Sequence, residues 1–124
     1  MFKYDPAFEP PAPAVAVDVS DPDTGKMTPC TALIDTGAFM SVVPASLARD
    51  LDLRPHSRVK ARGVGNQVID LSTYLVRLIV AGHVIVDLEV AAFDRQTMLL
   101  GRDVLQHFIL TLDGKAGAFT LVDP

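Results

Sequence analysis

The sequence predicts an all-β domain with one or two short helices. Short runs of alternating apolar and polar residues recur along the chain, and clusters of Gly, Asn, Asp and Pro separate them. The 124 residues are 49% hydrophobic, which is enough for a single core. We therefore expect one domain over residues 14–124, preceded by an N-terminal arm over residues 1–13.

The N-terminal third predicts the arm and the first hairpin. Four prolines between residues 5 and 13 predict that the arm is extended. A strand is expected over residues 14–19, where valines alternate with small or polar residues. Residues 20–26 form a polar run with Pro and Gly, which predicts a turn. A second strand is then expected over residues 27–34.

The rest of the chain predicts short helices and further hairpins. The helices are expected over 45–51 and 103–108, and the strands over 57–62, 67–71, 73–80, 83–90, 109–112 and 119–122. Gly65-Asn66 is a signal for a two-residue hairpin turn. In the strand over 83–90, alternation places Val84, Val86, Leu88 and Val90 on one face.

The segment Ala32-Leu33-Ile34-Asp35-Thr36-Gly37-Ala38 joins an apolar strand directly to an acidic residue. A carboxylate at the end of a buried strand costs free energy unless it is neutralised or used. The same tripeptide, Asp23-Thr24-Gly25, lies in the polar run that predicts a surface turn. We therefore expect chemistry at Asp35 and not at Asp23. The short spacing between the two, enough for a turn and one returning strand, argues against a pair within one chain.

The segment around Asp35 and the later segment Leu99-Leu100-Gly101-Arg102-Asp103 together resemble the retropepsin-like aspartic proteases, the single-lobe relatives of pepsin. The resemblance covers about residues 14–122. It implies a closed, single-lobe acid-protease β fold and an endopeptidase with Asp35 as the catalytic residue. It also implies that the second motif supports the active-site loop: its two leucines pack beneath that loop and Gly101 lets the chain pass close to it.

The residues after Asp35 are expected to support the active site. The resemblance implies that Thr36 braces the site across a dimer axis and that the Gly37 carbonyl helps to hold the substrate. Ala38 completes the motif. The hydroxyl of Ser41 is in a position to hydrogen-bond the Asp35 carboxylate, so we expect it to support that residue and not to act as a nucleophile.

Peptide hydrolysis of this kind needs two carboxylates that share a proton and activate a water. The chain offers one suitable Asp and is too short for two lobes, so a homodimer with one Asp35 from each subunit is the simplest solution. The segments 5–13 and 119–122 are expected to supply interface strands. The expected partners are a second copy of the chain and a peptide substrate. The alternative is a catalytically silent module of the same fold that binds peptides or dimerises.

The turn Gly63-Val64-Gly65-Asn66 resembles the flap of this family, which closes over the substrate. A substrate would bind there as an added strand, held mainly by main-chain hydrogen bonds. The alternative is an ordinary surface hairpin. The chain departs from the retroviral pattern at Phe39, because members often carry there an acid that pairs with the Arg of the second motif. The sequence therefore does not identify the residue that pairs with Arg102.

Other classes of function find little support. The net charge of −4 includes no basic stripe for nucleic acid, and no apolar run is long enough to cross a membrane. The N-terminus lacks the apolar region of a signal peptide, and the single Cys30 excludes an internal disulfide, so a cytoplasmic location is expected. We interpret Cys30 as a buried structural thiol. The three histidines, at 56, 83 and 107, lack metal-ligand spacing, so neither a metal nor a cofactor is expected.

Overall fold

The computed structural model describes the backbone of residues 1–124 and every side chain except that of Val64. It is mostly β, with two short helices, as the sequence predicts. The helices are α1 (Ala45–Asp50) and α2 (Arg102–Leu105), and a single 3-10 turn, η1, spans Val64–Asn66. The strands are β1 (Phe2–Lys3), β2 (Ala14–Ser20), β3 (Met27–Ile34), β4 (Val42–Pro44), β5 (Pro55–Arg62), β6 (Val68–Val80), β7 (His83–Phe93), β8 (Met98–Leu100), β9 (Ile109–Asp113) and β10 (Ala118–Val122). Among the described residues, neither helix has the length and hydrophobicity needed to cross a membrane.

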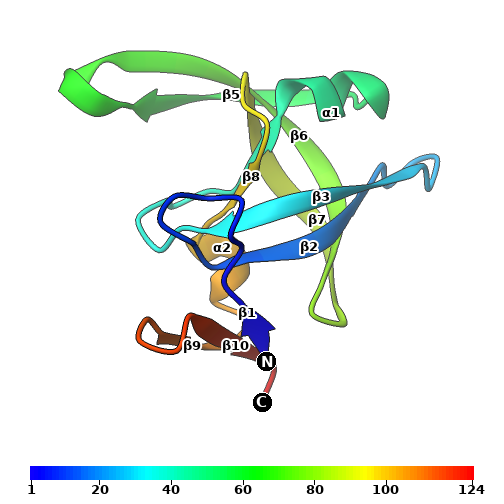
Figure 1. Cartoon of the computed structure of the whole chain (residues 1–124). Coiled ribbons are helices and arrows are strands. Elements are labelled where there is room, and N and C mark those ends of the chain that lie inside the picture. The colour runs from blue at the N-terminus through cyan, green and yellow to red at the C-terminus, as the bar shows by residue number, and fades with distance from the viewer.

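Six strands form a closed barrel. The larger sheet has the order β2-β3-β8-β4-β7-β6-β5, and an additional pairing of β2 with β6 closes the ring, so that only β5 lies outside it. The hairpin of β5 and β6 extends away from the barrel at the upper left of Figure 1. The closed β fold expected from the sequence is confirmed.

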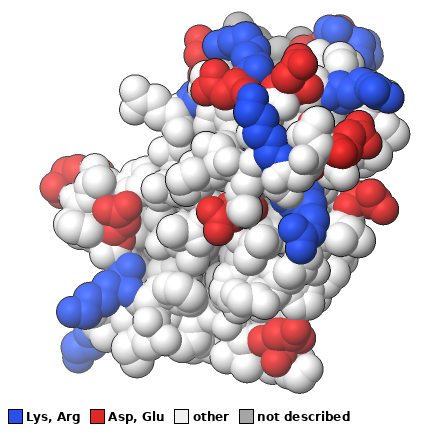
Figure 2. All heavy atoms as spheres, turned by 90° about the vertical axis from the view of Figure 1, so that its right-hand side faces the viewer, with Lys and Arg blue, Asp and Glu red and all other residues white. Residues whose placement is uncertain are grey.

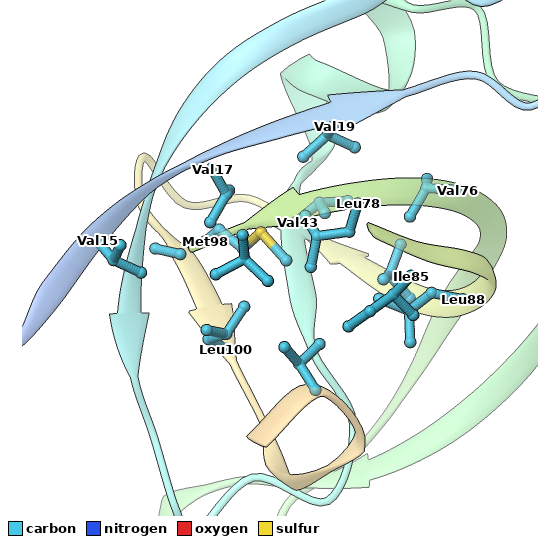
Figure 3. Packing of buried hydrophobic residues seen from close by; sticks show 14 of the residues in the cluster. Val15, Val17, Val19, Val43, Val76, Leu78, Ile85, Leu88, Met98 and Leu100 are labelled. Atoms are coloured by element: carbon cyan, nitrogen blue, oxygen red, sulfur yellow. The ribbon is translucent and has the colours of Figure 1, made fainter. Parts of the chain in front are cut away.

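Apolar side chains from every barrel strand fill the interior. Figure 3 shows valines of β2, Val43 of β4 and Leu78 of β6 pointing toward Met98 and Leu100 of β8. Met98 and Leu100 have no exposed surface. Full burial of such side chains contributes roughly 1.5–3 kcal/mol each to stability, and it fixes β8 at the centre of the fold.

Two strands that end at the predicted motifs lie side by side. β3 and β8 pair in parallel, with Ile34 opposite Leu100. Because parallel neighbours end at the same edge of a sheet, the chain leaves β3 at Asp35 next to the point where it leaves β8 at Gly101. The barrel therefore brings together two motifs that are far apart in the sequence.

A β-bulge corrects the predicted faces of β7. Val76 pairs with Leu88 and Leu78 pairs with Ile85, so that two residues of β7 oppose one residue of β6. Asp87 at the bulge has a φ of 53°. The extra residue reverses the alternation: Ile85 is buried, while Val84 and Val86 are 44% and 62% exposed. The prediction that both valines share a face with Leu88 is wrong.

The hairpin near residue 65 also differs from the prediction. β6 is one continuous strand over Val68–Val80, where two strands were expected. The turn has three residues and is closed by a hydrogen bond of 2.9 Å from the Gly63 amide to the Gln67 carbonyl. Gly65 and Asn66 have φ values of 81° and 64°, which these two residue types tolerate best.

The N-terminal arm is not extended, which corrects that prediction. Asp5 and Ala12 form an antiparallel bridge, so that the chain between them doubles back. β1 then joins a second, three-stranded sheet of the order β1-β10-β9. Figure 1 shows this sheet below the barrel, with the two chain termini close together. The division of the chain at residue 13 stays a prediction.

Candidate active site

Asp35 begins the loop that follows β3. Its amide donates a hydrogen bond of 3.0 Å to the carbonyl of Leu100 in β8. Its carboxylate Oδ1 accepts one of 3.0 Å from the amide of Gly37, and its carbonyl accepts one of 3.2 Å from the amide of Ala38. Asp35 is half-buried, and Thr36 and Gly37 are exposed. The loop therefore fixes the carboxylate and leaves it open to solvent on one side.

Gly101 of the second motif lies directly against this loop. A Cβ atom at Gly101 would lie 2.8 Å from the carbonyl oxygen of Ala38 and 2.9 Å from the carbonyl carbon of Met40. No real side chain tolerates such contacts with backbone atoms. The next amide, of Arg102, donates a hydrogen bond of 2.9 Å to the Ala38 carbonyl. Only glycine lets the two loops approach this closely.

Ser41 supports the second motif and not the Asp35 carboxylate. Its hydroxyl donates to Asp103 Oδ1 at 2.7 Å and accepts from the Gly101 amide at 2.9 Å. Its amide donates to Asp103 Oδ2 at 2.9 Å. Because Ser41 has no exposed surface, it fastens the loop after Asp35 to α2 from inside. The expected bond from Ser41 to Asp35 is wrong.

Arg102 finds its partner on the Asp35 loop. Its Nη1 donates a hydrogen bond of 2.9 Å to the carbonyl of Thr36, and the residue is exposed. Phe39, which stands where an acid was expected to pair with Arg102, is 56% exposed. A main-chain carbonyl therefore replaces a carboxylate as the acceptor, and this bond adds a third tie between the two motifs.

The predicted flap residues lie at the tip of the β5–β6 hairpin, beside a cavity of about 250 Å³. The hairpin forms one wall of this cavity through Ala61, Arg62, Gly63, Ile69 and Leu71. The other lining residues are Phe93 and Arg95, which we name the second wall, and Val42 and Leu99, which we name the floor. We name this cavity the hairpin cleft. The expectation that Val64 covers it concerns a side chain outside the described ones.

Leu99 connects the hairpin cleft to Asp35. It pairs with Leu33 of β3 and with Val42 of β4, and it directly precedes Leu100, which binds the Asp35 amide. The sequence assigned Leu99 only a supporting role, but its half-buried side chain lines the cleft. Sequence reasoning missed the other cleft residues, because nothing in the local pattern shows that Phe93 faces the hairpin.

Asp23 lies in the turn between β2 and β3, as expected. The carboxylate that organises this turn belongs to Asp21, which accepts from the Asp23 amide and from the Thr24 hydroxyl, both at 3.0 Å. No hydrogen bond to the Asp23 side chain occurs in the part of the chain that the structure describes. Among the described hydrogen bonds of this turn, Asp23 therefore contributes its backbone amide and not its carboxylate.

The sequence model of the aspartyl protease family matches residues 15–104, which include both motifs and most of the barrel. The chain belongs to this family. Among solved structures, it is similar to the EIAV protease complexed with the inhibitor HBY-793, with 28% identity and a TM-score of 0.63 over 77% of this chain and 86% of that one. The fold is also similar to that of the Simian Foamy Virus (mac) protease, at 20% identity and a TM-score of 0.56 over 76% and 92% of the two chains. No curated protein sequence matches the chain significantly.

The remaining chemical groups of this aspartyl protease chain are its histidines and Cys30, and His107 lines a cavity together with Phe39 and Met40 of the Asp35 loop. The ring centroids of His83 and His107 are 5.3 Å apart, and His83 Nδ1 lies 2.7 Å from Asp123 Oδ2. Among the described residues, no group of three potential ligands could hold a metal. Burial raises the pKa of the Cys30 thiol above its usual range.

Proposed function

We propose that the protein is an aspartic endopeptidase that acts as a homodimer. The observation that carries this proposal is the setting of Asp35. Its carboxylate accepts a hydrogen bond from the Gly37 amide, and its loop packs against Gly101. Its amide binds the carbonyl of Leu100, and the neighbouring Leu99 lines the hairpin cleft. A family match over both motifs supports the same assignment.

The chemistry requires a second carboxylate, which we assign to the partner's Asp35. Two carboxylates held close together share one proton, because both cannot ionise cheaply. The ionised carboxylate takes a proton from water, which attacks the peptide carbonyl carbon. The protonated carboxyl gives its proton to the carbonyl oxygen, and breakdown of the tetrahedral intermediate then delivers a proton to the leaving amine. Thr36 braces the pair, and the Gly37 carbonyl holds the substrate main chain.

The β5–β6 hairpin is proposed as the flap of this site. Its strand β5 lies outside the barrel ring, β6 connects it to the ring, and residues 63–66 stand at the tip. Closure of the hairpin over a bound peptide would exclude water from the carboxylates. An extended peptide in the hairpin cleft can form main-chain hydrogen bonds and insert alternate side chains between the two walls.

The sheet topology supports β9 as a dimer strand, and the expected contribution of segments 5–13 and 119–122 stays a prediction. β10, which contains residues 119–122, lies between β1 and β9, and β1 pairs only with Ala118 and Phe119. One edge of β9 has no partner among the described strands, and Ile109 and Leu112 on it are 56% and 47% exposed. A free edge with apolar side chains favours pairing with a second strand. We propose that two copies of β9 pair across the two-fold axis.

The two copies of the tripeptide provide a matched test of catalysis. We expect Asp35→Asn to lower peptide cleavage by at least about a hundredfold, because an amide can neither share the proton nor act as a base. Asp23→Asn should leave cleavage unchanged, since no bond to its side chain occurs in the described turn. Cleavage of a peptide library between pH 4 and pH 7 measures both. Equal losses contradict the assignment, and a wild type without activity favours the silent peptide-binding module.

Sedimentation measures the proposed interface separately. Leu112→Lys should convert a dimer into a monomer, because it places charge on the apolar edge of β9. Val86→Lys is the control, since Val86 is an apolar residue on β7 that is even more exposed than Leu112. A dimer that persists in Leu112→Lys would place the interface elsewhere.

The cytoplasmic location expected from the sequence stays a prediction.

A further inference from the structure

The hairpin cleft combines an apolar lining with positive charge. Its floor and walls expose Val42, Leu71, Phe93 and Leu99, and its charged residues are Arg62 and Arg95. No Asp or Glu lines it. An apolar side chain can therefore enter the cleft, and a negative charge beside that side chain would meet two guanidinium groups.

Neither guanidinium is neutralised by the chain itself. Among the described side chains, no carboxylate oxygen lies within 4.0 Å of Arg62 or Arg95. Arg95 Nε donates to the carbonyl of Thr97, which holds the head group in one orientation. Arg62 Nη1 makes only a long hydrogen bond of 3.5 Å to Asn66 Oδ1 at the hairpin tip. Both groups keep donors for a bound carboxylate.

The positive lining does not belong to a generally basic surface. The chain has a net charge of −4, and Figure 2 shows cations and anions interspersed at the end of the molecule that carries β5 and α1. The charged residues of the cavity that Phe39 and Met40 line are Asp87, Glu89 and Asp103, and no Lys or Arg lines it. Of these two cavities, only the hairpin cleft is thus lined by Arg and by no Asp or Glu.

We propose that the hairpin cleft selects peptides in which an Asp or Glu neighbours an aliphatic residue, with Arg95 as the specificity-determining residue. This inference rests on the proposed function, because it assigns the cleft to the peptide substrate. Arg95 presents a fixed planar fork, which matches a carboxylate better than a lysine would. In a two-fold dimer, each subunit supplies one such cleft, so the preference applies on both sides of the cleaved bond.

Peptide binding tests the preference without catalysis. The probes are fluorescent octapeptides with a central leucine and with Glu, Gln or Lys at each neighbouring position in turn, and the binding protein is Asp35→Asn. We expect the best Glu peptide to bind about tenfold or more tightly than its Gln counterpart, and the Lys peptide to bind most weakly. Adding Arg95→Gln should remove the difference between Glu and Gln, whereas Arg95→Lys should keep part of it.

Arg77→Gln is the matched control, because Arg77 is an exposed arginine on β6 that does not line the cleft. It should retain the preference for Glu. Equal binding of the Glu, Gln and Lys peptides, or no saturable binding of any Glu peptide, overturns the inference. Cleavage by the wild type without a preference for Glu overturns it and leaves the proposed function intact. Selective binding of Glu peptides without cleavage supports the inference and overturns the protease assignment.

Discussion

The two copies of Asp-Thr-Gly differ in what holds them. The turn that contains Asp23 is organised by its neighbour Asp21, through hydrogen bonds that span two or three residues. The loop that begins at Asp35 is tied to Leu100 and Arg102, more than sixty residues away. The same three residues thus form a self-sufficient surface turn in one place and one half of a long-range assembly in the other. Among the described residues, only the second copy uses its own Asp carboxylate as a hydrogen-bond acceptor, from the Gly37 amide.

The glycines of the two regions serve different needs. Gly25 has a φ of 74° and open space around it, so it is required only for its backbone conformation. Gly37 carries no such φ, but a Cβ there would lie 3.3 Å from Asp35 Oδ1. Gly101, which supports the second copy, has no room for a Cβ at all. The first region needs glycine for its backbone conformation, and the second needs glycine because neighbouring atoms pack closely against it.

The largest difference between the two regions in stability and cleavage is expected when their glycines are replaced by alanine. Gly101→Ala places a methyl group against three backbone atoms of the Asp35 loop, so one of the two loops must move. We expect a loss of unfolding free energy of about 3 kcal/mol, at the upper end of the cost of overpacking, together with loss of peptide cleavage. Urea unfolding and cleavage assays measure the two effects.

Gly25→Ala provides the comparison. An alanine with a positive φ costs about 1 kcal/mol, and nothing lies close enough to clash with its Cβ. Cleavage should be unchanged in the folded protein. If the two alanine variants lose the same stability and the same activity, then the contrast between local and long-range support is wrong.

Two buried serines, one near each copy of the tripeptide, test the same contrast between local and long-range support. Ser41→Ala leaves the buried Gly101 amide without its acceptor and removes one of the two hydrogen bonds to Asp103 Oδ1, which should cost about 2 kcal/mol and lower cleavage. Ser20, just before the first copy, is also buried, but its hydroxyl makes a single long bond of 3.5 Å to the Arg77 carbonyl. Ser20→Ala should therefore cost less than about 1 kcal/mol and keep full activity. Comparable costs in thermal unfolding would argue against a special role of Ser41.

The sequence sufficed to distinguish the two copies, because the difference is visible locally. An apolar strand precedes Asp35, and a polar run surrounds Asp23. Strand periodicity likewise predicted β2, β3 and the last hairpin nearly to the residue. These features depend on neighbours in the chain, which a sequence shows directly.

What the sequence did not reveal depends on contacts between distant segments. The bulge at Asp87 depends on how β7 pairs with β6, and it reverses a face that simple alternation assigns. The acceptor for Ser41 is 62 residues away, and the acceptor for Arg102 is a main-chain carbonyl, which has no sequence signature. The cleft residue Arg95 lies in a loop without any motif.

The smallest expected effect concerns Cys30, on the strand that joins the two copies. Burial raises the pKa of its thiol, so the reactive thiolate is scarcer at pH 8 than in an ordinary thiol, and alkylation by iodoacetamide should be slower in the folded protein than in urea. Because β3 pairs with β8, Gly101→Ala should expose Cys30 and speed this reaction, whereas Gly25→Ala should leave it unchanged. Mass spectrometry follows the modification. Equal rates in folded and unfolded protein would show that β3 does not shield the thiol, and equal acceleration by both variants would show that the two copies share their support.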